Sequence, residues 1–294
     1  MSQLQSDGDL AAEAAEAGPS GVRKAPEALY LDLIKRCLTR YGFDDDLTPV
    51  APIPAWRKRA WDKAVRVLDR HDWVMMRRVQ FRPELREEGL DWPRTAETMV
   101  GLRRLDNLQH CIESALASGV AGDVIECGVW RGGASIFMRA VLAAHGDTER
   151  TVWVADSFQG LPKPDPGNVA DRGDQHWTQS FLAVSLAEVK RNFSRYALLD
   201  QQVRFLKGWF SDTLPGAPIE RLAVLRVDGD MYGSTMDVLD ALYPKVSVGG
   251  FVIIDDFGAV PGCRAAVEDY RSEHGITEPI ERIDWAGVFW QRQR

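Results

Sequence analysis

The sequence predicts an α/β fold with a mostly parallel seven-stranded sheet, an antiparallel edge strand and an N-terminal helical extension. The first observation is that short apolar runs alternate with segments whose apolar residues recur every three to four positions. This alternation is typical of strand–helix units and favours a parallel sheet covered on both faces. The second is that the last two apolar runs have no helix between them, so we expect these two strands to be antiparallel.

The first hundred residues should lie outside the repeated units. Residues 1–25 contain acidic residues among Ala, Gly and Ser, with no basic residue before Arg23. Such a segment buries little surface, and we expect a disordered acidic tail. Residues 26–100 are expected to form a helical extension and lid, with helices at 28–40 and 55–76 joined by a proline-rich linker at 49–54. The irregular segment 79–98 is expected to be a lid or substrate-binding element.

Residues 101–294 contain the repeated units and should form the sheet. We expect strands at residues 123–127, 151–155, 203–206, 223–227, 251–254, 279–283 and 287–291. Helices are expected between them at residues 102–118, 136–142, 186–196, 234–243 and 262–274.

Composition and charge exclude several classes of function. The chain has 294 residues and a formal net charge of −7, so we expect no nucleic acid partner, because such a partner requires basic residues that neutralise phosphates. The four cysteines form no C-x-x-C pair, which indicates reduced thiols rather than a zinc knuckle. No apolar run approaches about 18 residues and no charged-then-apolar leader is visible, so we expect no membrane partner and a cytoplasmic protein.

A glycine-rich loop follows the first expected strand. Gly128, Gly132 and Gly133 are spaced G-x-x-x-G-G, which differs from the G-x-G-x-x-G of dinucleotide-binding loops. The spacing is similar to that of a P-loop, but Ala134 stands where the phosphate-binding lysine should be. A strand that ends in Glu126-x-Gly suits S-adenosylmethionine, because the glycines admit its amino-acid end and the carboxylate can accept from its ammonium group. Another α/β ligand loop and a purely structural turn are the alternatives.

Carboxylates recur at or just past the expected strand ends, which form the rim where open α/β sheets bind ligands. Asp156 follows the second strand and suits the ribose hydroxyls of an adenosine, with an N-cap of the next segment as the alternative. Asp228, Asp255 and Asp256 follow neighbouring strands and offer the hard oxygen ligands that Mg²⁺ prefers, with turn and cap chemistry as the alternative. The sequence therefore predicts a cofactor site and a metal site at one edge of the sheet.

Five longer motifs share a pattern. They are ECGVWRGG from Glu126, ADSFQGLP from Ala155, KGWF from Lys207 with DTLP from Asp212, RVDGDMYGST from Arg226, and PKVSVGGFVIIDD from Pro244. The chain resembles, from about residue 30 to about residue 290, the macrocin O-methyltransferase family. The resemblance implies a Rossmann-like class I methyltransferase that uses S-adenosylmethionine and Mg²⁺ on sugar hydroxyls of macrolide and aminocoumarin antibiotics. It also implies a homodimer or a higher homo-oligomer.

The resemblance assigns roles to individual residues. Those for the metal are Asp228, Asp255 and Asp256. Those for the cofactor are the backbone of Thr98 and Met99; Glu126, Gly128 and Ser135 at the amino-acid end; Asp156 and Ser157 at the ribose; Gly208, Trp209, Phe210 and Asp212 at the adenine; and Asp228.

The implied reaction is an in-line methyl transfer from a sulfonium to a hydroxyl of a small-molecule glycoside. Alignment of the two can contribute about 7–11 kcal/mol, and Mg²⁺ would lower the pKa of the hydroxyl. Asp228 or Asp230 could take the proton, and His176 is an alternative base, a substrate contact or an exposed loop histidine. A metal-dependent methyltransferase of a catechol-like or other small-molecule hydroxyl and a non-catalytic S-adenosylmethionine-binding protein are the competing hypotheses. The identity of the acceptor depends on segments 79–98 and 161–180.

Overall fold

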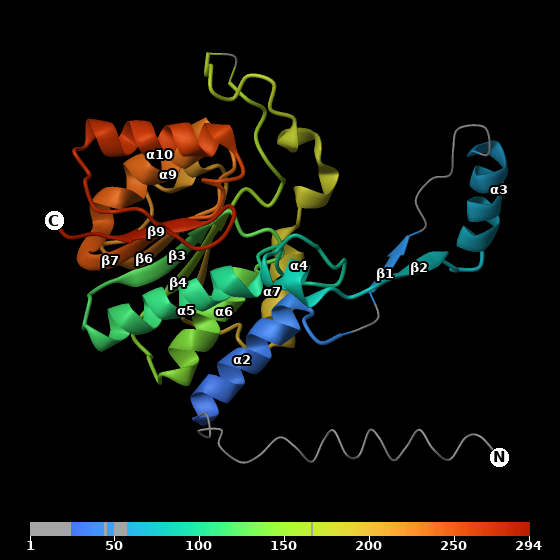
Figure 1. Cartoon of the computed structure of the whole chain (residues 1–294), viewed down its shortest axis with the longest axis horizontal. Helices are drawn as coiled ribbons and strands as arrows, with labels where there is room; N and C mark the ends of the chain where they lie inside the picture. Colours follow the sequence, from blue (N-terminus) through green and yellow to red (C-terminus); the bar gives the residue numbers. More distant parts are fainter. Residues whose placement is uncertain (1–24, 44–45, 50–57, 166) are drawn as a thin grey trace.

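A seven-stranded sheet forms the centre of the molecule in the computed structural model, which describes residues 25–43, 46–49, 58–165 and 167–294 (Figure 1). The acidic tail expected over residues 1–25 lies, apart from Ala25, outside these residues. The strands of the sheet are β3 (Asp123–Cys127), β4 (Val152–Asp156), β5 (Val203–Lys207), β6 (Leu222–Val227), β7 (Val246–Ile254), β8 (Glu281–Arg282) and β9 (Val288–Gln291).

The strand order is β5-β4-β3-β6-β7-β9-β8. The first five of these strands are parallel, and β9 runs antiparallel to both of its neighbours. The predicted fold class is therefore confirmed, with one refinement: β9 lies one place in from the edge, because β8 pairs beyond it. The chain leaves β3 on one side to form β4 and later returns to the other side to form β6. The carboxyl ends of these three strands therefore border the crevice where open α/β sheets bind ligands.

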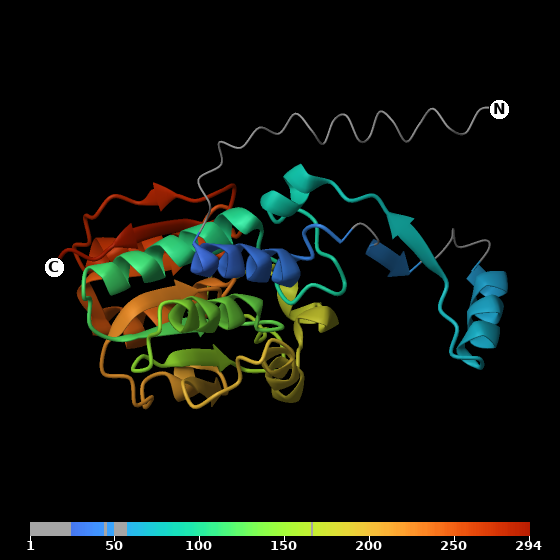
Figure 2. The same ribbon diagram turned by 90° about the horizontal axis from the view of Figure 1, so that it is seen from below.

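Helices cover both faces of the sheet (Figures 1 and 2). One face carries α2 (Pro26–Thr39), α5 (Leu102–Ala117), α6 (Gly133–Ala144) and α7 (Leu186–Arg195), whose apolar side chains share one core with β3, β4 and β6. The other carries α8 (Phe210–Thr213), α9 (Tyr232–Leu242) and α10 (Pro261–Glu273), which pack on a second core around Tyr270 and Trp290. The α2 helix, expected in the extension, thus belongs to the packed body.

An arm, whose residues follow α2 in the chain, projects from one side of the body (Figures 1 and 2). We define the arm as strand β1 (Asp46–Pro49), helix α3 (Lys58–Asp69) and strand β2 (Met76–Val79), with β1 and β2 antiparallel. The predicted helix over residues 55–76 is wrong at its C-terminal end, where Asp72 adopts a left-handed conformation (φ 55°) and the Trp73 N–H bonds back to the Leu68 carbonyl. Periodicity alone did not reveal this stop, since the apolar spacing continues past it. A short helix, α4 (Pro83–Glu87), follows in the segment expected to be irregular.

Among the described residues, no helix is both long and apolar enough to span a membrane.

Candidate functional site

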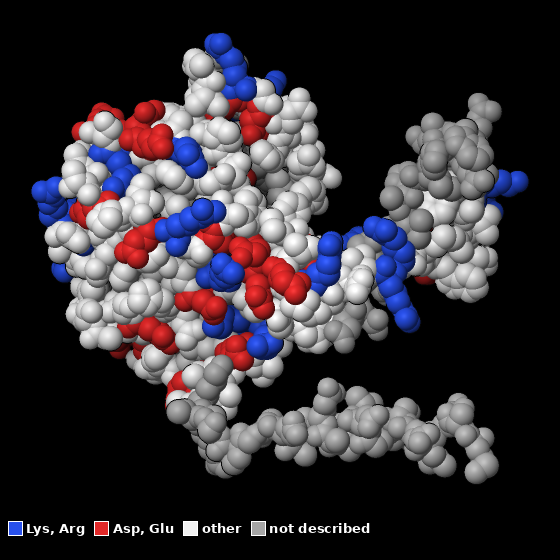
Figure 3. Space-filling view, viewed as in Figure 1, with Lys and Arg blue, Asp and Glu red and all other residues white. Residues whose placement is uncertain are grey.

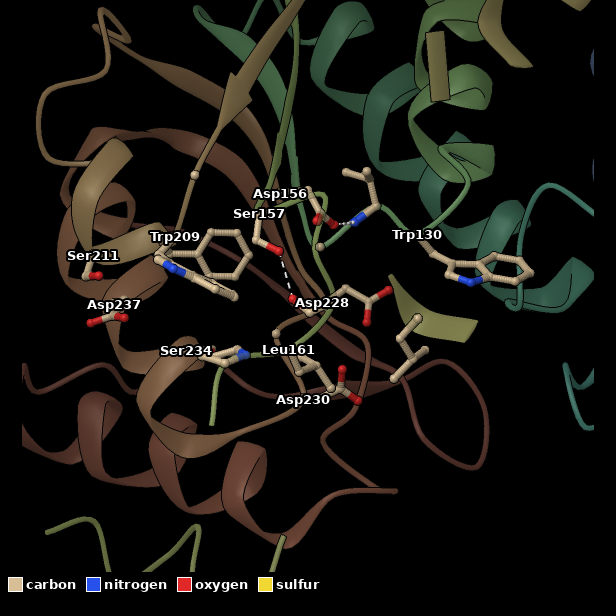
Figure 4. A pocket seen from close by; sticks show the side chains of 18 of the residues that line it. Trp130, Asp156, Ser157, Leu161, Trp209, Ser211, Asp228, Asp230, Ser234 and Asp237 are labelled. Carbon is tan, nitrogen blue, oxygen red and sulfur yellow. Dashed lines mark hydrogen bonds between the residues drawn. The ribbon is translucent and has the colours of Figure 1, made fainter. Parts of the chain in front are cut away.

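Two adjoining cavities open at the carboxyl ends of β3, β4 and β6. The β5-side cavity, of about 310 Å³, reaches the residues that follow β4 and β5 (Figure 4). The β7-side cavity, of about 590 Å³, reaches the residues that follow β7. They form one cleft, because they share the lining residues Met99, Val129, Trp130, Leu182, Asp228 and Asp230.

The glycine loop after β3 is held against the loop after β6. Gly128 has a φ of 89°, and a Cβ at this position would lie 1.8 Å from the backbone oxygen of Asp228. No side chain fits in that space, and the left-handed backbone also favours glycine. The Asp228 N–H donates to the Cys127 carbonyl at 2.8 Å. Glycine at 128 therefore brings the floor of the predicted cofactor site into backbone contact with the predicted metal site.

Glu126 places a buried carboxylate beneath the β7-side cavity. Its Oε1 accepts from Arg226 Nη1 at 2.6 Å, and its Oε2 accepts from the Ser135 hydroxyl. Burial raises the pKa of Glu126 to about 7, although Arg226 and Ser135 oppose the shift. An ammonium group bound beside Glu126 would favour its charged form. Ser135 orients Glu126 rather than lining the cleft itself.

Asp156 joins two loops at the wall of the β5-side cavity (Figure 4). One carboxylate oxygen accepts from the Val129 N–H at 2.8 Å and the other from the Phe158 N–H at 2.6 Å. Burial raises the pKa of Asp156, and the backbone hydrogen bonds counteract this. The neighbouring Ser157 hydroxyl donates to the Gly160 carbonyl at 2.7 Å. Asp156 therefore makes the backbone contacts expected of a residue that caps a turn. It also lines the cavity, as its proposed contact with the ribose requires.

The far end of the β5-side cavity is aromatic. Gly208, Trp209 and Phe210 line it as the resemblance predicts, whereas Asp212 is exposed and is not a lining residue. The carboxylate that does line this end is Asp237 of α9, close to Trp209 in Figure 4. Sequence reasoning missed Asp237. Its spacing of three from Ser234, which also lines the cavity, places the two on one helix face and could have indicated it.

The segment before α5 closes one side of the cleft. Met99 lines both cavities and Thr98 lines the β7-side cavity. The Gly133 N–H donates to the Glu97 carbonyl at 2.9 Å, and the Thr98 hydroxyl accepts from the Val100 N–H at 3.2 Å. These bonds hold Thr98 and Met99 beside the glycine loop, where their backbone can face a ligand.

Asp228, Asp255 and Asp256 converge after β6 and β7. Each offers one carboxylate oxygen, and these three oxygens lie within 4.8 Å of one another. The Asp256 Oδ2 is buried and has no hydrogen-bond partner among the described residues. Burial and the neighbouring carboxylates raise the pKa of Asp228 to about 6. They also raise the pKa of Asp256 well above its ordinary value. Three clustered oxygen donors, one of them without a partner, fit a hard divalent cation such as Mg²⁺.

Two buried arginines hold these carboxylates together. Arg226 Nη1 donates to Asp228 at 2.8 Å as well as to Glu126, and Arg226 Nη2 donates to Asp255. Arg104 donates to the other Asp255 oxygen and, at 2.7 Å, to Asp284. Neither arginine was singled out from the sequence. Arg226 could have been noticed as the single charge inside the apolar strand β6, and Arg104 as a charge at a buried position of α5.

Asp230 lines both cavities, and His176 lines the β7-side cavity. Asp230 has a left-handed backbone (φ 57°), a strained conformation of the kind that clusters at functional sites. Burial and the Asp228 charge raise the pKa of Asp230 to about 7, and the charge of His176 opposes this. His176 Nδ1 shares a hydrogen bond with Asp174 at 2.7 Å, and the exposed residue lines the β7-side cavity. The structure therefore brings all three candidate bases, Asp228, Asp230 and His176, to one cavity.

Comparisons with known proteins place the chain in one family. Residues 27–292 match the family model described as macrocin-O-methyltransferase (TylF). The chain is 54% identical over 265 residues to the 8-demethyl-8-(2,3-dimethoxy-alpha-L-rhamnosyl)-tetracenomycin-C 4'-O-methyltransferase of Streptomyces olivaceus, covering 90% of this chain and 92% of the relative. It is 51% identical to the mycinamicin III 3''-O-methyltransferase of Micromonospora griseorubida, covering 90% and 96%. Among solved structures, the O-methyltransferase NovP superposes with a TM-score of 0.78 at 47% identity, covering 91% of this chain and all of that one.

Proposed function

Because the chain belongs to the macrocin O-methyltransferase family, we propose that it uses S-adenosylmethionine and Mg²⁺ to methylate a sugar hydroxyl of a glycosylated natural product. The observation that carries the proposal is the cleft itself. Asp156 lines the β5-side cavity, and Glu126 lies in the adjoining β7-side cavity together with the cluster of Asp228, Asp255 and Asp256. Such a cleft can hold a methyl donor and an oxygen acceptor side by side. The names of the relatives, which act on a rhamnosyl tetracenomycin and on mycinamicin III, support a glycoside as acceptor.

The residues of the cleft supply the binding and the alignment. Glu126 would accept hydrogen bonds from the ammonium group of the cofactor, and Asp156 would accept from its ribose. The aromatic end beside Trp209 and Phe210 would take the adenine, with Asp237 as a polar partner. Asp228, Asp255 and Asp256 would hold Mg²⁺, which when bound supplies Lewis-acid polarisation of the acceptor hydroxyl.

We assign the proton transfer to Asp230. It lines both cavities, and a pKa of about 7 is suited to a general base that works near neutral pH. Asp228 is already bonded to Arg226 and belongs to the carboxylate cluster. His176 is exposed and bonded to Asp174, so it is better placed to contact the acceptor or to tune Asp230.

The arm supports a homodimer or higher homo-oligomer. Trp61, Val65 and Leu68 of α3 are only half-buried, and an amphipathic helix normally buries its apolar face. In Figure 3 basic side chains gather at the arm, whereas acidic and basic side chains are intermixed over the sheet domain. The arm can therefore pair with acidic side chains on the body of a second copy. A cytoplasmic location is also proposed, supported by four cysteine thiols that are free in the structure.

The test is a methyl-transfer assay with a panel of α-L-rhamnosides and, in parallel, catechol. Methylation of a rhamnoside that stops with a chelator and returns with Mg²⁺ is the expected result. Full turnover in chelator would remove the metal from the proposal. Methylation of catechol but of none of the glycosides would favour the competing hypothesis of a catechol-type enzyme.

A further inference from the structure

Aromatic side chains from four segments border the β7-side cavity. Trp92 comes from the segment before α5, Trp130 from the glycine loop, Phe181 from the segment between β4 and α7, and Trp285 from the turn between β8 and β9. We call these four residues the aromatic rim. Trp92 is 57% exposed, Phe181 50% and Trp285 37%, whereas Glu126 and Asp255 are buried. The rim is therefore the mouth of the cavity, and the carboxylates are its floor.

The three indole N–H groups of the rim are already engaged. Trp130 donates to the Phe181 carbonyl at 2.9 Å, Trp285 to the Glu88 carbonyl at 2.8 Å and Trp92 to the Gly89 carbonyl at 3.2 Å. These bonds fix the orientation of the rings and tie the loops of the rim to one another. Because the polar tips are engaged, the rings can contact a ligand only through their π systems. A guanidinium already lies over two of them, Arg131 over Trp130 at 4.4 Å and Arg104 over Trp285 at 5.5 Å from the ring centroid.

Two of the rings lie next to each other. The centroids of Trp92 and Phe181 are 6.5 Å apart, and their planes are tilted by 35°. Both rings line the β7-side cavity, so one flat ligand can contact both of them. Trp130 lies on the opposite side of the cleft from Trp209 (Figure 4), so the rim is separate from the aromatic end of the β5-side cavity.

We propose that the aromatic rim binds a planar aromatic aglycone and is the specificity determinant of this enzyme. This inference rests on the proposed function, in which the acceptor is a glycoside. The sugar hydroxyls then face the carboxylates on the floor of the cavity, and the aglycone remains at the mouth. A flat π system that stacks on aromatic rings buries apolar surface and also gains a favourable quadrupole interaction. An aliphatic ring of the same size buries a similar surface but has no such quadrupole interaction.

Binding to the wild-type protein tests the proposal without any variant. Phenyl, cyclohexyl and methyl α-L-rhamnoside are titrated by calorimetry into the protein saturated with S-adenosylhomocysteine and Mg²⁺. We expect the phenyl glycoside to bind about tenfold more tightly than the cyclohexyl glycoside, which corresponds to about 1.4 kcal/mol. Equal affinity of these two would overturn the assignment of an aromatic aglycone. If none of the three binds, the proposed function itself fails, and this result is distinct from equal binding.

Variants then locate the contact. Trp92→Leu and Phe181→Leu should each remove most of the advantage of the phenyl glycoside, with the affinities for methyl rhamnoside and S-adenosylhomocysteine unchanged. Trp177→Leu is the matched control, because Trp177 is 42% exposed in the same segment as Phe181 but does not line the cavity. An equal loss for phenyl and methyl rhamnosides would place the rim against the sugar and overturn the proposal. An equal effect of the control variant would also overturn it.

Discussion

Replacing Arg226 by methionine tests whether this buried arginine allows the carboxylates of the cleft to lie together. Methionine fills much of the same volume but leaves Glu126, Asp228 and Asp255 without the guanidinium that contacts all three. Removing one partner of a buried ion pair costs about 3–5 kcal/mol. The Asp228 side chain is 27% exposed, so Glu126 and Asp255 should account for most of the loss. We expect Arg226→Met to lower the free energy of unfolding by about 3–5 kcal/mol at pH 8.

Urea unfolding of the metal-free protein measures this loss. Arg226→Lys keeps the charge but has no planar fork to reach three carboxylates, so its loss should be intermediate. Arg139→Met is the control, because it breaks a pair with Asp200 outside the cleft, where the Asp200 side chain is 30% exposed. A partly exposed pair contributes about 1 kcal/mol or less. If Arg226→Met were as stable as Arg139→Met, the role of Arg226 as counter-ion would be refuted.

The pH dependence of the same measurement is an independent check. Burial raises the pKa of Glu126 from 4.5 to about 7, so the charged form is disfavoured in the folded protein. The free energy of unfolding of the metal-free wild type should therefore fall as the pH rises from about 4.5 to about 7. Without Arg226 the charged carboxylates also lose their counter-ion. The destabilisation caused by Arg226→Met should then be larger at pH 8 than at pH 5, and equal losses would contradict this reasoning.

The remaining predictions concern the metal, the base, the cofactor and the arm. Asp256→Asn should weaken Mn²⁺ binding in a titration followed by electron paramagnetic resonance while sparing S-adenosylhomocysteine affinity; unchanged Mn²⁺ affinity would argue against the metal site. Asp230→Asn should lower kcat about 10²–10⁴-fold and His176→Gln much less, measured as methyl transfer at saturating cofactor; the reverse order would make His176 the base. Glu126→Gln should weaken S-adenosylhomocysteine binding about 10- to 100-fold by calorimetry, the usual effect of losing a hydrogen bond to a charged group, and an unchanged affinity would remove Glu126 from the cofactor site. The double substitution Val65→Glu and Leu68→Glu should reduce the mass measured by light scattering to that of a monomer. An unchanged mass would exclude this face of α3 from the interface.

Local pattern was enough to predict the sheet and much of the cleft. Strands β3, β4 and β6 have Glu126, Asp156 and Asp228 at or just past their carboxyl ends. They are short apolar runs followed by turn residues, and parallel strands bring such ends to one rim independently of the loop conformations. The pattern failed where local signals conflict. The apolar spacing continues past the end of α3 at Asp69, although a turn with a left-handed Asp72 and a Trp73 N–H bond to the Leu68 carbonyl ends the helix there.

Other parts of the site depend on contacts between distant segments. Asp237 lines the β5-side cavity because α9 packs beside the loop after β5. The aromatic rim combines Trp92 with Trp285, which are far apart in the chain and meet around one cavity. Arg226 is an intermediate case, since a lone charge in an otherwise apolar strand predicts a buried partner without saying which one.

The close approach of Gly128 to the backbone of Asp228 has an evolutionary consequence. Because main-chain atoms set this distance, the span between the proposed cofactor site and the carboxylate cluster does not depend on the side chains at the mouth of the cleft. Substitutions at the mouth would then change which molecule enters while this span stays the same. Two relatives that are 54% and 51% identical over the aligned residues carry the names of a rhamnosyl tetracenomycin and of mycinamicin III, a difference that such a division permits.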